Sequence, residues 1–321
     1  MSRAVLGALW LALLGCTEGL DPAGLVRTPR ILAIVAEPPD VPPGTDLSFT
    51  AMISVPASVP GPVRMRWSAC LDEQTVLSET GLPAAPGVDE PTSCDPVQLD
   101  PGVPFVVSGA RTLAMLEMLA TSTHLGDDDA TRRMRVGGIV ASIGFVFLAR
   151  LELVDAEGHT LVEGYKRAVV RLPLVFPTTT NPPPPVFAID GLSVAATGEP
   201  FVCASLGPLS VTADTDVELA PILLGDEEPW LEEYVALDYS AGLSRQREGA
   251  YYSWFVSAGP GDRNHAGTLS PETTRRPDRR ATWHTPSEPG GYSVWLVVRD
   301  GHLGTSACRA DVTVAASPPA L

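Results

Sequence analysis

Short runs of alternating apolar and polar residues, separated by proline-rich turns, fill the early part of the chain. Residues 47–55 largely alternate, and in residues 63–67 (VRMRW) the apolar side chains fall on one face and both arginines on the other. Such alternation is typical of half-buried strands. An earlier apolar run ends at the prolines and glycine of residues 37–44, because proline lacks the N–H that a strand ladder needs. This order predicts a β-sandwich.

The second half of the chain shows a similar pattern. Residues 186–195, 201–204 and 211–224 predict further strands. Turn signals at Asp155-Ala156-Glu157-Gly158 and Arg299-Asp300-Gly301 predict a hairpin near the end of each half. Between the halves, residues 178–185 end in four prolines, which favour polyproline II and space domains semi-rigidly. We therefore expect two similar domains.

Four stretches depart from the strand pattern. Residues 111–123 combine leucine and methionine with good helix formers and no proline, so we expect a short helix inserted between strands. Residues 136–149 are predicted to form one or two buried strands, since their glycines weaken a helix. Residues 226–236 are acidic and allow a short helix, and residues 259–280 are polar and predict an exposed loop.

The N-terminus has a composition of its own. Met1-Ser2-Arg3 precedes an uncharged run of 11 residues, Ala4 to Leu14, which is too short to span a bilayer. This anatomy is that of a secretory signal, and Leu13-Leu14-Gly15-Cys16 resembles the lipobox of bacterial lipoproteins, in which the signal is cut before a cysteine that carries diacylglycerol. The resemblance implies a lipid on Cys16. Thr17, rather than aspartate, implies attachment to the outer membrane, on its periplasmic or surface face.

These features divide the chain into six segments. Residues 17–30 have few large apolar side chains, so we expect a tether without packed elements. The predicted boundaries are a cleaved signal at 1–15, a lipidated tether at 16–30, a first sandwich at 31–177, a linker at 178–185, a second sandwich at 186–316 and a tail at 317–321.

The cysteine count predicts disulfide bonds in an exported chain. Without Cys16, four cysteines remain, which allow three connectivities. We predict Cys70–Cys94 and Cys203–Cys308, because each bond then stays within one sandwich. Zinc is the competing interpretation, but the chain has no C-x-x-C pair and no histidine in zinc-like spacing to a cysteine. We therefore predict no metal site and no cofactor.

Composition and motifs argue against several functions. Acidic residues outnumber basic ones by 38 to 22, and the net charge of −16 opposes binding to nucleic acid. Membrane contact must come from the lipid. No G-x-S-x-G elbow, H-E-x-x-H motif, P-loop or dinucleotide fingerprint occurs.

Some residues allow two interpretations. The acids of Gly126-Asp127-Asp128-Asp129 are interpreted as a solvated turn rather than a calcium site. Neighbouring carboxylates are interpreted as a solvated face rather than a general acid and base. Four tryptophans could line a carbohydrate-binding surface, although alternation favours the core for Trp254 and Trp295. The carboxylates are Asp214 and Asp216, Glu227 and Glu228, and Glu232 and Glu233, and the tryptophans are Trp230, Trp254, Trp283 and Trp295.

The C-terminal part, from about Tyr251, resembles PKD-like and bacterial immunoglobulin-like modules. Those modules place a tryptophan, here Trp254, on a central strand and a Pro-Gly-x-Tyr turn, here Pro289-Gly290-Gly291-Tyr292, before a late strand. The chain has Gly259-Pro260-Gly261-Asp262 where PKD modules have Gly-Asp-Gly. The resemblance implies tandem immunoglobulin-like β-sandwiches, in which the tyrosine hydroxyl bonds back to the backbone as a corner.

The sequence thus predicts a lipid-anchored, non-catalytic cell-envelope protein of binding or structural type, such as a scaffold or adhesin. Its partner would be another envelope protein or a polysaccharide. The alternative is a carbohydrate-active enzyme or other hydrolase built on sandwiches, which would need a deep pocket with carboxylates from both domains. A third hypothesis is a stalk that calcium makes rigid.

Overall fold

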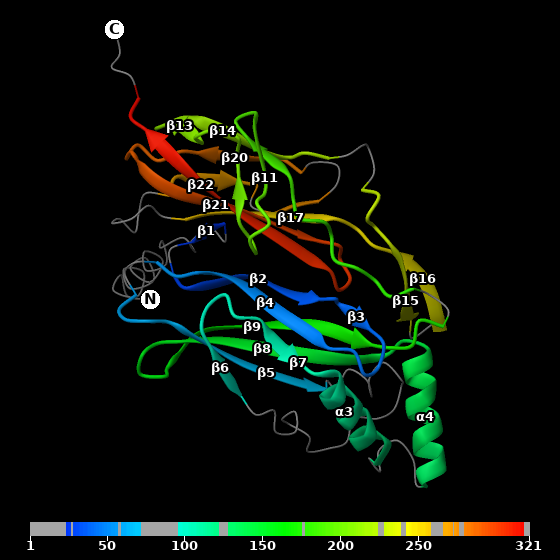
Figure 1. Cartoon of the computed structure of the whole chain (residues 1–321). Coiled ribbons are helices and arrows are strands. Elements are labelled where there is room, and N and C mark those ends of the chain that lie inside the picture. Colours follow the sequence, from blue (N-terminus) through cyan, green and yellow to red (C-terminus); the bar gives the residue numbers. More distant parts are fainter. Residues whose placement is uncertain are drawn as a thin grey trace, which may run out of the picture.

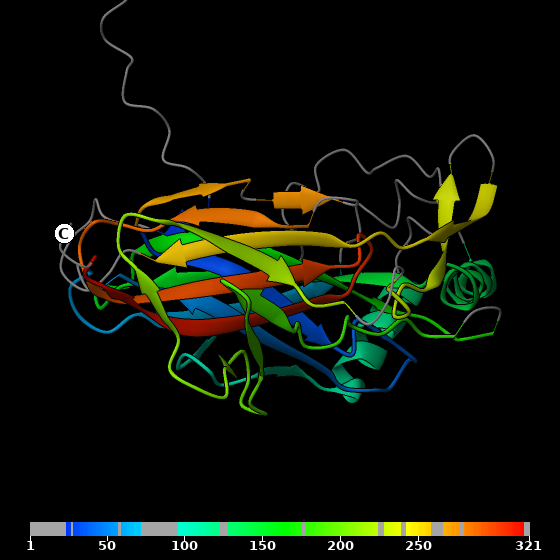
Figure 2. The ribbon, with the colours of Figure 1, turned by 90° about the horizontal axis from the view of Figure 1, so that it is seen from above.

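The chain folds into two packed β-sandwiches with two helices attached to the first (Figure 1). Viewed from above in Figure 2, the long strands of the two units lie over one another. The predicted all-β, tandem-sandwich fold is confirmed. The computed structural model describes residues 24–26, 28–56, 59–71, 96–121, 128–174, 177–223, 228–238, 242–257, 266–271, 273–275 and 279–317.

The first sandwich consists of a three-stranded and a five-stranded sheet. The smaller sheet has the order β2-β4-β7, and the larger one has the order β3-β9-β8-β5-β6. The hairpin of β8 and β9 confirms the turn predicted near residue 155. The strands are β2 (Arg30–Glu37), β3 (Asp40–Val41), β4 (Leu47–Ser54), β5 (Arg64–Leu71), β6 (Val97–Leu99), β7 (Phe105–Val107), β8 (Phe145–Val154) and β9 (Thr160–Val170).

The second sandwich consists of two six-stranded sheets. One has the order β1-β17-β21-β22-β13, with β19 also paired to β17, and the other has the order β12-β11-β10-β14-β20-β18. The predicted final hairpin is formed by β21 and β22, and β15 and β16 form a separate hairpin. The strands are β1 (Leu25–Val26), β10 (Phe187–Ile189), β11 (Leu192–Ala196), β12 (Cys203–Ala204), β13 (Ser210–Thr212), β14 (Asp216–Pro221), β15 (Glu233–Asp238), β16 (Gly242–Arg247), β17 (Tyr251–Ser257), β18 (Thr268–Ser270), β19 (Thr273–Arg275), β20 (Ala281–His284), β21 (Gly290–Arg299) and β22 (Thr305–Ala315).

The strand order of both units is immunoglobulin-like. In the second unit, β10-β14-β20-β18 follows the A-B-E-D order of an immunoglobulin sheet, and β17-β21-β22 follows C-F-G. In the first unit, β2-β4-β7 takes the A-B-E positions and β5, β8 and β9 take C, F and G. A short strand also runs parallel to the last strand of each unit, β3 beside β9 and β13 beside β22.

Two aromatic features of the immunoglobulin fold are present. Trp254 on β17 is fully buried, and its ring packs edge-on against Phe187 at 5.5 Å between centroids. Trp67 takes the same strand position in the first unit and stacks on Phe105, also at 5.5 Å. At the start of β21 the hydroxyl of Tyr292 donates to the Glu288 carbonyl at 3.0 Å, which is the predicted tyrosine corner.

The insertion between β7 and β8 contains two helices instead of one. Helix α3 (Gly109–Thr121) confirms the predicted helix, whereas α4 (Asp129–Ala141) lies partly where we predicted strands. The strand prediction is therefore wrong for residues 136–141 and right for 145–149. Packing explains the difference, because the apolar side of α4 is buried in the core of the first sandwich. The free energy gained by this burial outweighs the loss of helix stability caused by the glycines. The acidic turn starts this helix, where Asp128 accepts from the Thr131 N–H at 2.8 Å.

Three other expectations are corrected. The tether contains a packed element, because Leu25 and Val26 of β1 are buried and pair in parallel with β17. The acidic stretch ends in strand β15, where we allowed a helix. Within the predicted exposed loop, β18 and β19 pair with β20 and β17, and Leu269 is buried. The partner of β1 is distant in sequence, whereas β15 pairs with the next strand, β16, in a hairpin, and in all three cases the polar composition of the segment gives no sign of the pairing.

A disulfide bond links the two sheets of the second sandwich. It joins Cys203 on β12 to Cys308 on β22, as the sequence predicts, with Cα atoms 5.7 Å apart. The two cysteines are 105 positions apart in the sequence, so the bond constrains most of this unit. Cys94, the predicted partner of Cys70, lies outside the described residues.

The tryptophan at the centre of the first sandwich provides a test of its core. We expect Trp67→Ala to lower the free energy of unfolding by roughly 3–5 kcal/mol, because it leaves a cavity against Phe105. Urea unfolding followed by circular dichroism measures this loss. The control is Met134→Ala on α4, where the side chain is 70% exposed and the change should stay within about 0.5 kcal/mol. Equal effects of the two substitutions would contradict this core assignment.

Candidate functional site

An apolar interface joins the two sandwiches. Strands β2 and β4 of the first unit face β21 and β22 of the second (Figure 1). Trp295, which alternation predicts to be buried, lies in this interface. The two units that the prolines connect are therefore packed against each other through a shared core. The buried side chains of this interface cluster are Val26, Leu32, Ala33, Met52, Trp295, Val297 and Ala307.

The proline-rich linker is hydrogen-bonded to both sandwiches. The Asn181 amide donates to the Ala36 carbonyl at 2.7 Å and to the Glu37 carboxylate at 2.6 Å, and it accepts from the Thr305 N–H at 2.9 Å. The chain also packs closely at Gly304, where a Cβ would lie only 2.8 Å from a linker proline. These contacts fix the linker between the units.

Several charged groups are buried near the linker. Arg171 and Asp40 form an ion pair, with Nε and Oδ2 2.7 Å apart, and both are almost fully buried. Lys166 of β9 reaches the second sandwich, where its ammonium donates to the Leu303 carbonyl and, at 2.9 Å, to the Thr305 hydroxyl. Burial lowers the pKa of Lys166 to about 8, because the charged form loses its water.

Asp300, in the turn between β21 and β22, belongs to this group. It is 1% exposed, and its Oδ1 accepts from the His302 N–H at 2.7 Å, while its Oδ2 has no hydrogen-bond partner among the described residues. Burial raises the pKa of Asp300 to about 6, and the nearby charge of Glu248 adds to this rise. The carboxylate also attracts the Lys166 ammonium. The junction therefore contains groups that titrate near neutral pH.

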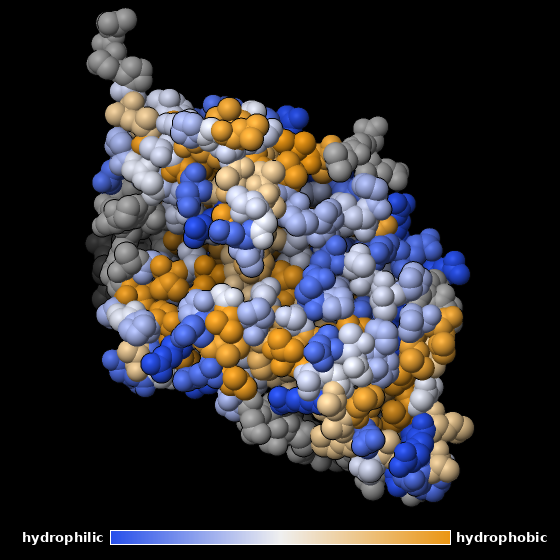
Figure 3. Space-filling model, in the orientation of Figure 1, coloured by the Kyte–Doolittle hydropathy of each residue, from blue (hydrophilic) through white to orange (hydrophobic). Residues whose placement is uncertain are grey.

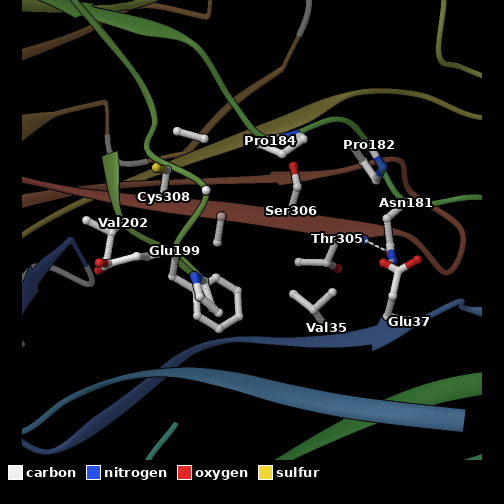
Figure 4. Close-up of a pocket in the computed structure, with 15 residues that line it drawn as sticks. Val35, Glu37, Asn181, Pro182, Pro184, Glu199, Val202, Thr305, Ser306 and Cys308 are labelled. Atoms are coloured by element: carbon white, nitrogen blue, oxygen red, sulfur yellow. Dashed lines mark hydrogen bonds between the residues drawn. The ribbon is translucent and has the colours of Figure 1, made fainter. Parts of the chain in front are cut away.

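A pocket of about 300 Å³ opens at the same junction (Figure 4). Its walls come from β2, the linker, the loop between β11 and β12, and the first half of β22. Phe201 in this wall has a φ of 62°, a left-handed conformation that is rare for a bulky residue. Its carbonyl accepts from the Arg309 N–H at 2.8 Å, which holds the loop against β22.

The pocket is mostly apolar and carries one acid from each unit. Glu37 ends β2 of the first sandwich, and Glu199 lies in the loop before β12 of the second. The described residues that line the pocket include no lysine, arginine or histidine. Of its hydroxyls, that of Ser306 donates to the Pro183 carbonyl at 3.0 Å, and that of Thr305 accepts from Lys166.

The acids singled out from the sequence lie elsewhere. Asp214 and Asp216 both contact the exposed His284, at 3.3 and 2.9 Å. Glu228 is buried against Arg279 at 2.7 Å and lines a separate pocket with Trp230. No local signal marked Glu37 or Glu199, because only tertiary folding brings them together.

Two of the other acids that the sequence singled out form polar contacts in the structure. Glu232 accepts from the linker at Thr180, and Glu233 pairs with Arg245 at 3.8 Å. Glu227 and Cys16 lie outside the described residues.

A group of three exposed or half-exposed side chains with ligand atoms close together occurs at the β8–β9 turn, at Asp155, Glu157 and His159.

Apolar side chains are also exposed on the helical insertion, visible at the lower right of Figure 3. Leu113 and Met118 of α3 and Met134 of α4 are each about half exposed or more. In the described part of the chain, neither helix has the length and apolar character needed to span a bilayer. These side chains lie away from the pocket, which no helix lines.

Comparisons with known proteins give distant structural likenesses only. No family model matches the sequence, and no curated protein matches it. Fibronectin(III)-like modules of Clostridium thermocellum CbhA align over 90% of this chain and 95% of theirs, with 9% identity and a TM-score of 0.21. The D0–D1 domain of intimin aligns over 88% and 98% with 8% identity and a TM-score of 0.19, and murine CEACAM1b over 89% and 100% with 9% and 0.20. TM-scores this low are no evidence for the fold, which is assigned from the order of the strands instead.

Asp300 provides a test of the buried charges. Because its folded pKa of about 6 lies above the ordinary 3.8, the folded protein binds this proton more tightly. Its contribution to stability is therefore complete below pH 3.8 and is lost as the pH rises to about 6. The unfolding free energy of wild type minus that of Asp300→Asn should fall by roughly 2 kcal/mol between pH 4 and 7.

The measurement is urea unfolding across this pH range. The control is Asp100→Asn, which changes an exposed turn between β6 and β7. The Asp300→Asn difference from wild type should change more steeply with pH than the Asp100→Asn difference, and equal slopes would contradict the raised pKa of Asp300.

Proposed function

We propose that this protein is a non-catalytic binding or structural protein of the bacterial cell envelope, anchored to the outer membrane by a lipid on Cys16. The observation that carries the proposal is the joining of two immunoglobulin-like sandwiches by a shared core and a bonded linker. Such a unit presents surfaces in a fixed arrangement, which suits a scaffold or adhesin. Its partner would be another envelope protein or a polysaccharide.

The proposed location is supported by sequence and by covalent structure. Residues 1–15 have the pattern of a signal, followed by a cysteine in lipobox context. The Cys203–Cys308 disulfide is typical of proteins that fold outside the cytoplasm. The net charge of −16 favours neither nucleic acid nor direct adhesion to anionic lipid.

Lipid attachment is tested by growing expressing cells with an alkyne fatty acid and separating their membranes. Wild type should carry the label and be found in the outer-membrane fraction. The Cys16→Ala variant should be unlabelled and absent from that fraction. The control is the pair Cys203→Ser and Cys308→Ser, which removes two other cysteines and should keep the label. If mass spectrometry of the native protein finds a free thiol at Cys16, the proposed lipid attachment is contradicted.

A hydrolase is the second candidate, and one contact favours it. The Thr305 hydroxyl lines the pocket and lies 2.9 Å from the Lys166 amine, whose lowered pKa is suited to a base. Pairs of a hydroxyl nucleophile with lysine occur in some hydrolases. Against this, the same ammonium also donates to the Leu303 carbonyl, so it serves the interface.

Hydrolysis of a p-nitrophenyl ester at pH 9, where Lys166 is largely neutral, separates the two candidates. Under our proposal, wild type and Thr305→Val show the same background rate. A faster wild-type rate that is lost in Thr305→Val and in Lys166→Met, and kept in Thr305→Ser, would instead establish a catalytic pair.

A further inference from the structure

Two exposed glutamates, Glu37 and Glu199, line the interdomain pocket. The Glu199 carboxylate forms no hydrogen bond or ion pair with any described residue, although its backbone is bonded within the loop. Glu37 uses Oε2 to accept from Asn181, which leaves Oε1 without a partner in the described structure. A ligand can therefore find an acceptor at each acid without breaking an existing contact.

The other polar side chains of the pocket are already bonded. Asn181 donates and accepts within the interface, and Ser306 donates to a linker carbonyl. The Thr305 hydroxyl accepts from Lys166. The side chains of the pocket therefore offer a ligand mainly acceptors, and those acceptors are negatively charged.

The electrostatic environment favours a positive ligand. No basic side chain lines the pocket among the described residues, and the whole chain carries a net charge of −16. Lys166 donates to the Thr305 hydroxyl in the pocket wall, but its ammonium is buried and interacts with the charge of Asp300. A pocket of one sign concentrates counter-charged ligands.

Much of the pocket wall is apolar. Val35 comes from the first sandwich, and Val202 and Ala307 come from the second. Figure 4 shows Glu199 beside Val202 on one side of the pocket and Glu37 near Val35 on the other, with Thr305 and Ser306 between them. An alkyl chain would contact these walls, while a charged centre along its length would meet no polar partner there.

We propose that the pocket binds a linear aliphatic diamine, with one ammonium group at Glu37, the other at Glu199, and the alkyl chain along the apolar wall. The proposal rests on the binding role proposed above and gives that role a ligand class. A monoamine would form an ion pair with only one of the two glutamates, and a diol, which has no charge, would form an ion pair with neither. Both should therefore bind more weakly than the diamine.

The test is isothermal titration calorimetry of the purified full chain with α,ω-diamines of four to eight carbons at low salt. We expect one preferred length, and binding at least tenfold tighter than that of the monoamine or diol of the same length. Glu37→Gln and Glu199→Gln should each weaken the diamine about tenfold, to the level of the monoamine. Glu157→Gln, at an exposed turn of the first sandwich, is the matched control and should change nothing.

Two outcomes would overturn the proposal. One is the absence of measurable binding at millimolar diamine. The other is binding that all three substitutions weaken equally, which would indicate general attraction to an acidic protein. Because the titration needs no lipid and no membrane, failure here would leave the lipid-labelling result unaffected, and failure of the labelling would leave the titration unaffected.

Discussion

The apolar contact between the two sandwiches is the constraint on which the rest of the structure depends. Leu32 and Met52 on one side and Trp295 and Val297 on the other are removed from water only when the units are packed together. Burial of apolar area is the main favourable term in such packing. Because these side chains lie on outward faces of their own sheets, each sandwich alone would expose an apolar patch. The pair therefore behaves as one folded body in which the linker is an internal segment.

The charged groups at the junction determine orientation more than they add stability. Removing Asp300 and Lys166 from water is costly, and the attraction between two buried charges often recovers little more than that cost. Their partners, however, are fixed in place, since Lys166 bonds two groups of the opposite unit and Asn181 bonds both units. A shifted arrangement would leave these groups buried and unpaired. The polar contacts thus favour one arrangement among those that the apolar surfaces allow.

The pocket and the start of the chain both follow from this arrangement. The pocket exists because the loop around Phe201, the linker and β2 meet at the junction, and none of these segments forms a cavity alone. Strand β1 extends the sheet of the second sandwich just before β2 enters the first. The first strand that the structure describes therefore contributes to the second sandwich, and the next one belongs to the first. Strands β1 and β2 thus tie this part of the chain to both sandwiches.

The sequence alone determined the parts of this protein that depend on local pattern. Three such patterns each involve only a few neighbouring residues: the alternation around Trp67 and Trp254, the turn signals of the two late hairpins, and the Pro-Gly-x-Tyr turn that ends at Tyr292. So does the apolar run that forms α3. The Cys203–Cys308 bond could also be inferred, because an even cysteine count and one domain boundary leave few choices.

Tertiary structure decided what depends on partners distant in the chain. Glycines argued against α4, but its apolar side is buried against the first sandwich. The polar composition of residues 259–280 predicted an exposed loop, but β18 and β19 form there because partner strands supply their hydrogen bonds. Glu37 and Glu199 are far apart in sequence and acquire a shared pocket only when the sandwiches pack. Propensity acts over a few residues, whereas burial and pairing depend on the whole fold, so the pocket could not be foreseen from the sequence.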